Sequence, residues 1–151
     1  MATSKMQIEV GDLLDREFPE YRIHENHRPD WFISSEATRL EIDFYIEELK
    51  IAFEVQGDQH YHYVPFFHKD QADFERRKKF DEEKKELCAG YGIKFYEICT
   101  KTDAIIAVKE IRDSLPGQPK YSYSDIPQEH KSTWTHMSTK HKQEYLLSQK
   151  R

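Results

Sequence analysis

Residues 40–63, LEIDFYIEELKIAFEVQGDQHYHY, decide the fold, because they contain two short strand patterns that each carry an acid. In the first pattern apolar residues alternate with polar ones, the period of two that is expected of a half-buried strand. Asp43 then lies opposite the apolar face. In the second pattern, from Lys50 to Gln56, the same alternation places Glu54 and Gln56 together on one face.

The link between the two strands, residues 47–49, is polar and short enough for a hairpin. We therefore expect antiparallel neighbours, which bring Asp43 close to Glu54. Hard divalent cations such as Mg²⁺ take oxygen ligands from one or two carboxylates and keep several waters. Such a cation polarises a phosphoryl oxygen and activates a water, so a phosphodiester is the natural substrate. The sequence predicts that Asp43 and Glu54 bind Mg²⁺, with Mn²⁺ as a substitute, and that Gln56 adds a polar group.

An Asp followed by Glu-x-Gln on the next strand resembles the core of the PD-(D/E)XK nucleases, with Gln56 in the usual lysine position. The resemblance covers roughly residues 36–98 and continues through Gly57, Gln59, His60 and Tyr61, then Pro65, Phe66 and Phe67, then Asp81, Lys84 and Cys88, then Gly92 and Ile93. This succession of residues is similar to that of a group of phage, large-virus and bacterial endonucleases related to very-short-patch repair enzymes and to EDxHD homing endonucleases. The resemblance implies an α/β fold with a restriction-endonuclease-like core, in which a mixed central sheet is flanked by helices in the order αβββαβα.

The resemblance also implies metal-dependent hydrolysis of phosphodiester bonds in DNA and assigns further roles. It makes His60 a general base or a ligand of the metal-bound water. Lys84, which reaches in from a helix, could replace the charge that is missing at Gln56. The expected partner is DNA, as branched, mismatched or site-specific duplex, with a homodimer left open and no membrane.

Relatives of this kind often place a Glu on the first helix, where it reaches the metal. The position that matches best is Gln7, with Glu9 and Asp12 nearby. These residues also fit solvated positions on an amphipathic helix, as surface charges usually do.

The remaining elements follow from periodicity, glycines and prolines. We expect helices over residues 6–17, 71–89 and 104–115, and one around 140–149. Gly90 is the expected left-handed cap of the second helix. A strand from Ile93 to Ile98 should pair in parallel with the strand of Glu54, because the crossover through a helix is long enough.

The chain of 151 residues carries a formal charge of −5, so any surface that attracts nucleic acid must be local. We expect a nuclease domain over residues 1–116. Residues 117–151 form a polar extension with a basic bias, which fits either nucleic-acid contact or a flexible solvated tail. No apolar run approaches a membrane span and the first residues lack the layout of a secretory signal. The protein is expected inside the cell, in the cytoplasm, or in the host cell if it is viral or from a phage.

Two alternatives stay open. His60, His62 and His68 could form a zinc site with Cys88 or Cys99, although the paired spacing of structural zinc sites is missing, and the two cysteines suit a reducing compartment. The stronger alternative is a nuclease-fold protein that is catalytically weak or inactive and binds nucleic acid or a protein partner. It is favoured by the glutamine in the lysine position.

Overall fold

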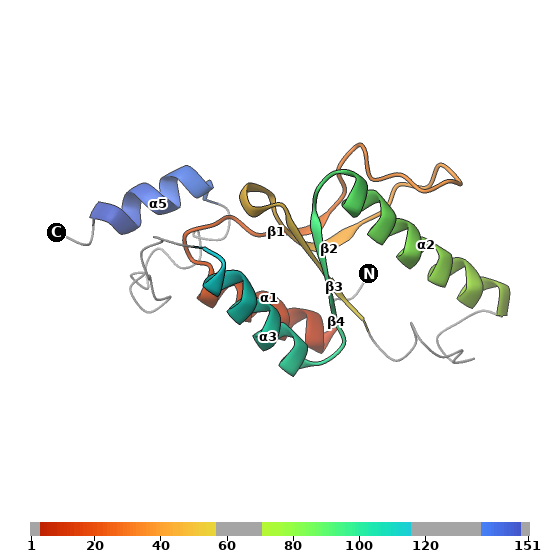
Figure 1. The fold of residues 1–151 in the computed structure, drawn as a ribbon, viewed down its shortest axis with the longest axis horizontal. Coiled ribbons are helices and arrows are strands. Elements are labelled where there is room, and N and C mark those ends of the chain that lie inside the picture. The colour runs from red at the N-terminus through yellow and green to blue at the C-terminus, as the bar shows by residue number, and fades with distance from the viewer. Residues whose placement is uncertain (1–3, 57–70, 116–136, 149–151) are drawn as a thin grey trace. The chain divides into compact units, whose positions relative to one another are not determined.

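The computed structural model describes residues 4–56, 71–115 and 137–148, and it has the predicted α/β class with a four-stranded mixed sheet (Figure 1). The order of its elements up to residue 113 is α-β-β-β-α-β-α, as expected. The elements are α1 (Lys5–Glu17), β1 (His24–His27), β2 (Ile42–Ile46), the 3₁₀ turn η1 (Glu47–Leu49), β3 (Ile51–Val55), α2 (Gln71–Gly90), β4 (Lys94–Ile98), α3 (Lys101–Asp113) and α5 (Thr139–Ser148).

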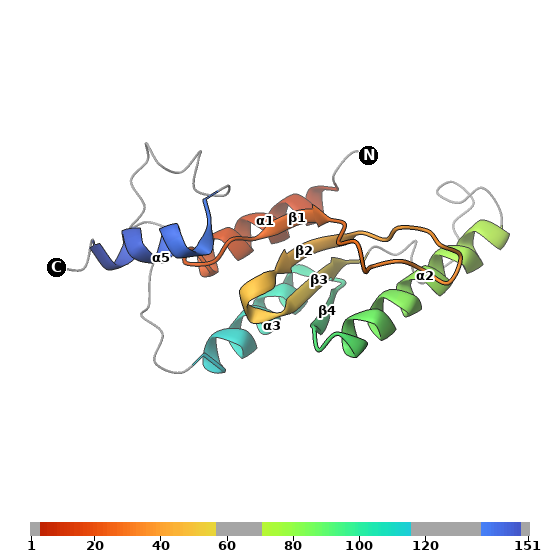
Figure 2. The same cartoon turned by 90° about the horizontal axis from the view of Figure 1, so that it is seen from above.

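The sheet has the strand order β1-β2-β3-β4. β3 and β4 are parallel, with Ile51 opposite Lys94 and Glu54 opposite Glu97, which confirms the predicted crossover through α2. β2 and β3 are hydrogen-bonded neighbours joined only by η1, a link so short that the strands must be antiparallel (Figure 2). β3 therefore lies between two strands, and four of its five residues are buried.

The chain divides into two compact units. The second unit, Glu25–Tyr45 with Lys50–Cys99, contains α2 and nearly all of the sheet. Its core brings together apolar residues from the strands, from α2 and from the segment before β2: Phe32, Leu40, Ile42, Tyr45, Ala52, Cys88 and Ile93, with Trp31, Phe80, Leu87 and Phe95 packed against them. The mixed-charge sequence of α2 is thus held by a narrow apolar stripe, which explains why its periodicity is weak.

The end of α2 corrects one prediction. Gly90 is the last helical residue, whereas Gly92 has the left-handed conformation, with φ +71°. The Ile93 N–H donates to the Cys88 carbonyl at 2.8 Å and the Gly92 N–H donates to the Ala89 carbonyl at 3.1 Å. This is the Schellman pattern, in which the residue at the position of Gly92 must adopt positive φ.

The first unit, Met1–His24 with Ile46–Leu49 and Thr100–Arg151, contains α1 packed against α3 (Figure 1). α3 begins at Lys101, three residues before the predicted start. Thr100 and Asp103 form a capping box, in which each side chain accepts the backbone N–H of the other. Arg112 of α3 donates to the buried carboxylate of Glu20 at 2.5 Å.

α5 is packed within the first unit, which corrects the expectation of a solvated tail for residues 137–148. Thr139 accepts the Arg22 N–H at 3.0 Å and donates to Glu48 at 2.5 Å. The ammonium of Lys142, which is 1% exposed, donates to the Tyr21 carbonyl at 3.0 Å. Burial lowers the pKa of Lys142 to about 8. Lys142 is therefore unavailable for the phosphate contact that the basic bias of the extension suggested.

Within the described residues, no helix is both long enough and apolar enough to cross a membrane.

Candidate functional site

Asp43 of β2 and Glu54 of β3 are linked through each other's strand. The Asp43 N–H donates to Glu54 Oε2 at 3.1 Å, and the Val55 N–H donates to Asp43 Oδ2 at 2.8 Å. Each carboxylate therefore accepts a backbone N–H of the neighbouring strand. The predicted proximity of the two acids is confirmed, while their chemical role stays a prediction.

Burial is the dominant influence on both acids. Glu54 is 4% exposed and its pKa is raised to about 8, because burial, with a smaller contribution from Asp43, outweighs the lowering effect of Lys84. Burial likewise raises the pKa of Asp43, against the lowering effect of the Val55 N–H and of Lys84. Burial disfavours a negative charge unless a cation compensates it. At neutral pH the Glu54 carboxyl therefore tends to retain a proton.

Lys84 of α2 supplies one such cation, because its ammonium donates to Glu54 Oε1. Burial lowers the pKa of Lys84, but the neighbouring carboxylates of Glu54, Asp43 and Asp81 outweigh that effect and leave it raised. The ammonium thus donates to Glu54 and is attracted electrostatically by Asp43. If both carboxyl groups were ionised, the cluster would keep one negative charge, which a further cation would neutralise. The sequence indicated Lys84 through the Asp81-x-x-Lys84 step, and the structure brings it to the strands as expected.

Gln56 follows β3 directly and continues its pairing, since its N–H donates to the Ile98 carbonyl at 2.8 Å. The residue is 3% exposed. Its Oε1 atom is buried and has no hydrogen-bond partner among the described residues. A buried acceptor without a donor typically costs about 1–3 kcal/mol, so this oxygen can gain from a donor that enters beside Glu54.

Sequence reasoning missed a second lysine–acid pair beside the first. Glu97 of β4 is opposite Glu54 in the parallel register, and its Oε1 atom is 2.5 Å from the ammonium of Lys85. Consecutive lysines of α2 thus contact acids on adjacent strands. The alternation of β4 marks Glu97 as a polar position, but only the register identifies its neighbour.

The structure leaves two groups of predicted site residues untested. His60, with His62, His68 and the Gly57 turn, lies in residues 57–70, outside the described residues. Gln7, Glu9 and Asp12 lie on α1 in the first unit, where the Gln7 N–H donates to Ser4 Oγ at 3.1 Å and caps the helix. A role for these residues in binding metal stays a prediction.

The donor set of the cluster suits a hard cation. In the described part of the chain, no group of three or more His, Cys, Asp or Glu residues is arranged to hold a metal ion. The linked carboxyl groups of Glu54 and the partly exposed Asp43 nevertheless offer the one or two oxygen ligands that Mg²⁺ requires besides its waters. Burial raises the pKa of the Cys88 thiol to about 11, which disfavours the thiolate form that zinc prefers.

Two viral proteins are similar to part of the chain. Uncharacterized protein 307L of Invertebrate iridescent virus 6 is 35% identical over 78 residues, which cover 47% of this chain and 39% of that protein. Uncharacterized protein 094L of Frog virus 3 (isolate Goorha) is 43% identical over 60 residues, 39% of each chain. The chain thus spans about two fifths of the length of these curated relatives. No protein-family model matches the sequence, and no solved structure matches it significantly.

Proposed function

We propose that this protein is a metal-dependent endonuclease that hydrolyses phosphodiester bonds in DNA. The observation that carries the proposal is the linkage of the half-buried Asp43 and the buried Glu54 through each other's strand, with the ammonium of Lys84 donating to Glu54. Burial raises the pKa values of both carboxyl groups, and the positive charge of Lys84 does not offset it. Perturbed acids of this kind are typical of functional sites, and a divalent cation is the partner that would complete this one.

Asp43 and Glu54 would hold Mg²⁺, or Mn²⁺ in its place. When bound, the cation would polarise a phosphoryl oxygen and lower the pKa of a water. Lys84 would donate hydrogen bonds to a phosphate oxygen and supply the positive charge that Gln56 lacks. The Oε1 atom of Gln56, which has no partner among the described residues, would accept a hydrogen bond from the attacking water and orient it. The proton of that water would pass to His60, because an amide cannot accept it.

The fold supports the same proposal. The order α-β-β-β-α-β-α and the mixed sheet are what the resemblance to the PD-(D/E)XK nucleases implies, so we assign a restriction-endonuclease-like core to the chain. In this assignment α2 contributes Lys84 to the two central strands, which carry the acids.

A second candidate is a nuclease-fold protein that binds nucleic acid or a protein partner without cutting. The buried amide of Gln56 favours it, because that side chain occupies the usual lysine position and cannot transfer a proton. The two candidates differ in one outcome, which is whether a backbone bond breaks.

Incubation of the purified chain with a panel of nucleic acids separates the candidates. The panel contains branched, mismatched, nicked and plain duplex DNA, with single-stranded DNA and RNA alongside. The proposal predicts cleavage of at least one DNA in Mg²⁺ or Mn²⁺ and none in EDTA. Binding without cleavage in either metal would favour the second candidate. Cleavage that persists in EDTA would contradict the metal-dependent mechanism.

A further inference from the structure

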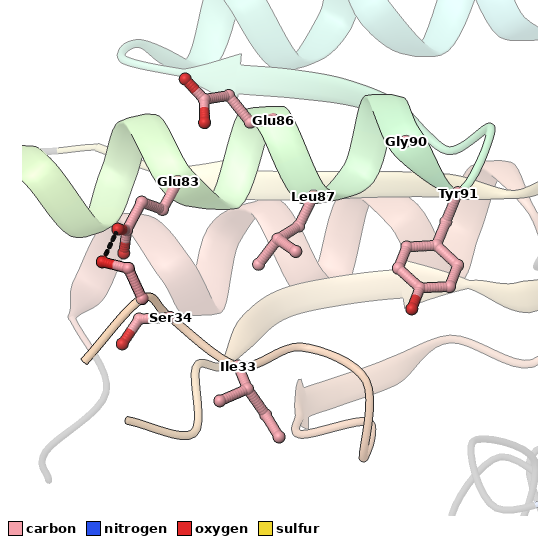
Figure 3. A pocket seen from close by; sticks show the side chains of 8 residues that line it. Ile33, Ser34, Glu83, Glu86, Leu87, Gly90 and Tyr91 are labelled. Atoms are coloured by element: carbon pink, nitrogen blue, oxygen red, sulfur yellow. Dashed lines mark hydrogen bonds between the residues drawn. The ribbon is translucent and has the colours of Figure 1, made fainter. Parts of the chain in front are cut away.

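A cavity of about 360 Å³ lies within the second unit, between the later turns of α2 and residues 33–35 (Figure 3). Two contacts join these segments around it. The Ser35 hydroxyl donates to Glu83 Oε1, and the rings of Trp31 and Tyr91 lie 4.3 Å apart between centroids. The cavity volume is in the range of small-ligand sites, and these contacts form it before any ligand arrives.

The segment that forms the opposite wall is itself held in place. The Ser34 hydroxyl oxygen accepts the N–H groups of Glu36 at 3.2 Å and Thr38 at 3.1 Å. The Ser34 N–H in turn donates to the Thr38 carbonyl at 2.8 Å. A wall built in this way loses little conformational freedom when a ligand binds.

The lining combines apolar surface with negative charge. Ile33 is 44% exposed and Tyr91 is 53% exposed, and Leu87 lies beside them. The charged lining residues are Glu83 and Glu86, and none of the lining residues is Lys, Arg or His. The carbonyl end of α2, at Gly90, adds partial negative charge.

The carboxylate of Glu83 lacks a second donor. Ser35 satisfies Oε1, whereas Oε2 is buried and has no hydrogen-bond partner among the described residues. A buried carboxylate oxygen in this state is stabilised by a donor, most strongly by a cationic one. This independent observation indicates what the cavity would bind.

We propose that the cavity binds the side chain of a lysine or an arginine presented by a partner protein. The ammonium or guanidinium would donate to Glu83, and the aliphatic stem would pack on Ile33, Leu87 and the Tyr91 ring. A phosphate group would instead be repelled by the two glutamates. A free cation would leave the exposed side chains of Ile33 and Tyr91 uncovered, whereas the aliphatic stem of a basic residue would pack on them, which favours a peptide over a free cation.

This site is separate from the carboxylate cluster. Lys84 follows Glu83 directly in α2, but its ammonium contacts Glu54 of the sheet, whereas Glu83 contacts the segment of Ser35. The inference therefore does not depend on the proposed function.

Titration of the ¹⁵N-labelled full chain, followed by amide chemical shifts, tests the proposal. The probes are N-acetyl-arginine amide and N-acetyl-lysine amide, with the neutral isostere N-acetyl-norleucine amide as the control. We expect shifts centred on residues 33–35 and 83–91, with weak, about millimolar affinity because one side chain supplies all the contacts. Glu83→Gln should weaken binding at least about tenfold, since a charge-assisted bond becomes a neutral one. Glu86→Gln should weaken it a few-fold.

Glu82→Gln is the matched control, because it makes the same charge change at an exposed position of the same helix that does not line the cavity. It should leave binding unchanged, and thermal melting checks that all three variants fold. Equal shifts with the norleucine probe, or equal losses in the Glu82 and Glu83 variants, would overturn the proposal. Shifts centred on Asp43 and Glu54 would show that the cation binds the carboxylate cluster instead. Shifts at the cavity with deoxycytidine, and none with the basic probes, would make it a nucleobase pocket.

Discussion

Replacing Glu54 with glutamine should make the metal-free protein more stable at pH 8 and should leave its stability at pH 5 nearly unchanged. The Glu54 carboxyl has a pKa of about 8 in the folded chain, against its ordinary value of 4.5. Between these values the folded state holds a proton that the unfolded state has released. The free energy of unfolding of the wild type therefore falls as the pH rises from 4.5 to 8.

The size of this effect follows from the two pKa values. One pH unit corresponds to about 1.4 kcal/mol, so the full loss by pH 8 is about 5 kcal/mol, whereas at pH 5 it is below about 1 kcal/mol. A loss of that size is comparable to the whole stability of many domains. Glutamine has no proton to lose, and its amide oxygen can still accept from Lys84.

Urea denaturation in EDTA at several pH values from 5 to 8.5 measures this difference directly. Glu41→Gln is the matched control, because Glu41 is a partly exposed neighbour on the same segment that pairs with Arg28 at 2.9 Å. The free energy of unfolding of this control should depend on pH as that of the wild type does. Parallel curves for the wild type and Glu54→Gln, or a variant that is less stable at pH 8, would refute the physical account of the cluster.

Three further outcomes follow from the same cluster. Mg²⁺ at pH 8 should restore much of the stability that the wild type loses at this pH, and should have little effect on the stability of Asp43→Ala. Thermal melting with and without the ion measures both effects. Equal stabilisation of the two proteins would show that the ion binds elsewhere. Lys84→Met should lower the single-turnover cleavage rate by about a hundredfold or more. Lys85→Met, which removes a half-exposed ion pair, should change that rate by less than about threefold. Equal effects of the two substitutions would contradict a specific role for Lys84. His60→Ala should slow cleavage by about a hundredfold to ten-thousandfold with the melting temperature unchanged, and a variant that melts early but cuts normally when folded would show a structural histidine.

The pairing of Asp43 with Glu54 could be predicted because it depends on local features alone. A period of two determines which side chains share a face of the sheet, and a link of a few residues permits only antiparallel pairing of the two strands. Lys84 could be expected only from the resemblance, in which the Asp81-x-x-Lys84 step faces the active strands, because charge pattern alone does not distinguish it from the other lysines of α2.

Features that depend on the assembled chain could not be predicted. Gly90 and Gly92 are both plausible caps in sequence, and only the packing of Ile93 decides between them. The proximity of Glu97 to Glu54 follows from the register of a parallel pair, which no short-range pattern specifies. The burial of Lys142 depends on a carbonyl group 121 residues away in the sequence. From the sequence alone, Lys142 therefore cannot be distinguished from a solvated lysine.

The measurement that tests the nuclease proposal most directly is the single-turnover cleavage rate of the wild type and Asp43→Ala in Mg²⁺, on the best DNA substrate from the panel. Glu41→Ala, two residues away on the same segment, is prepared in parallel as the control. The proposal predicts that Asp43→Ala folds but cleaves at least about a thousandfold more slowly, since it loses a metal ligand, whereas Glu41→Ala cleaves like the wild type. A folded Asp43→Ala protein that cleaves at the wild-type rate would contradict it.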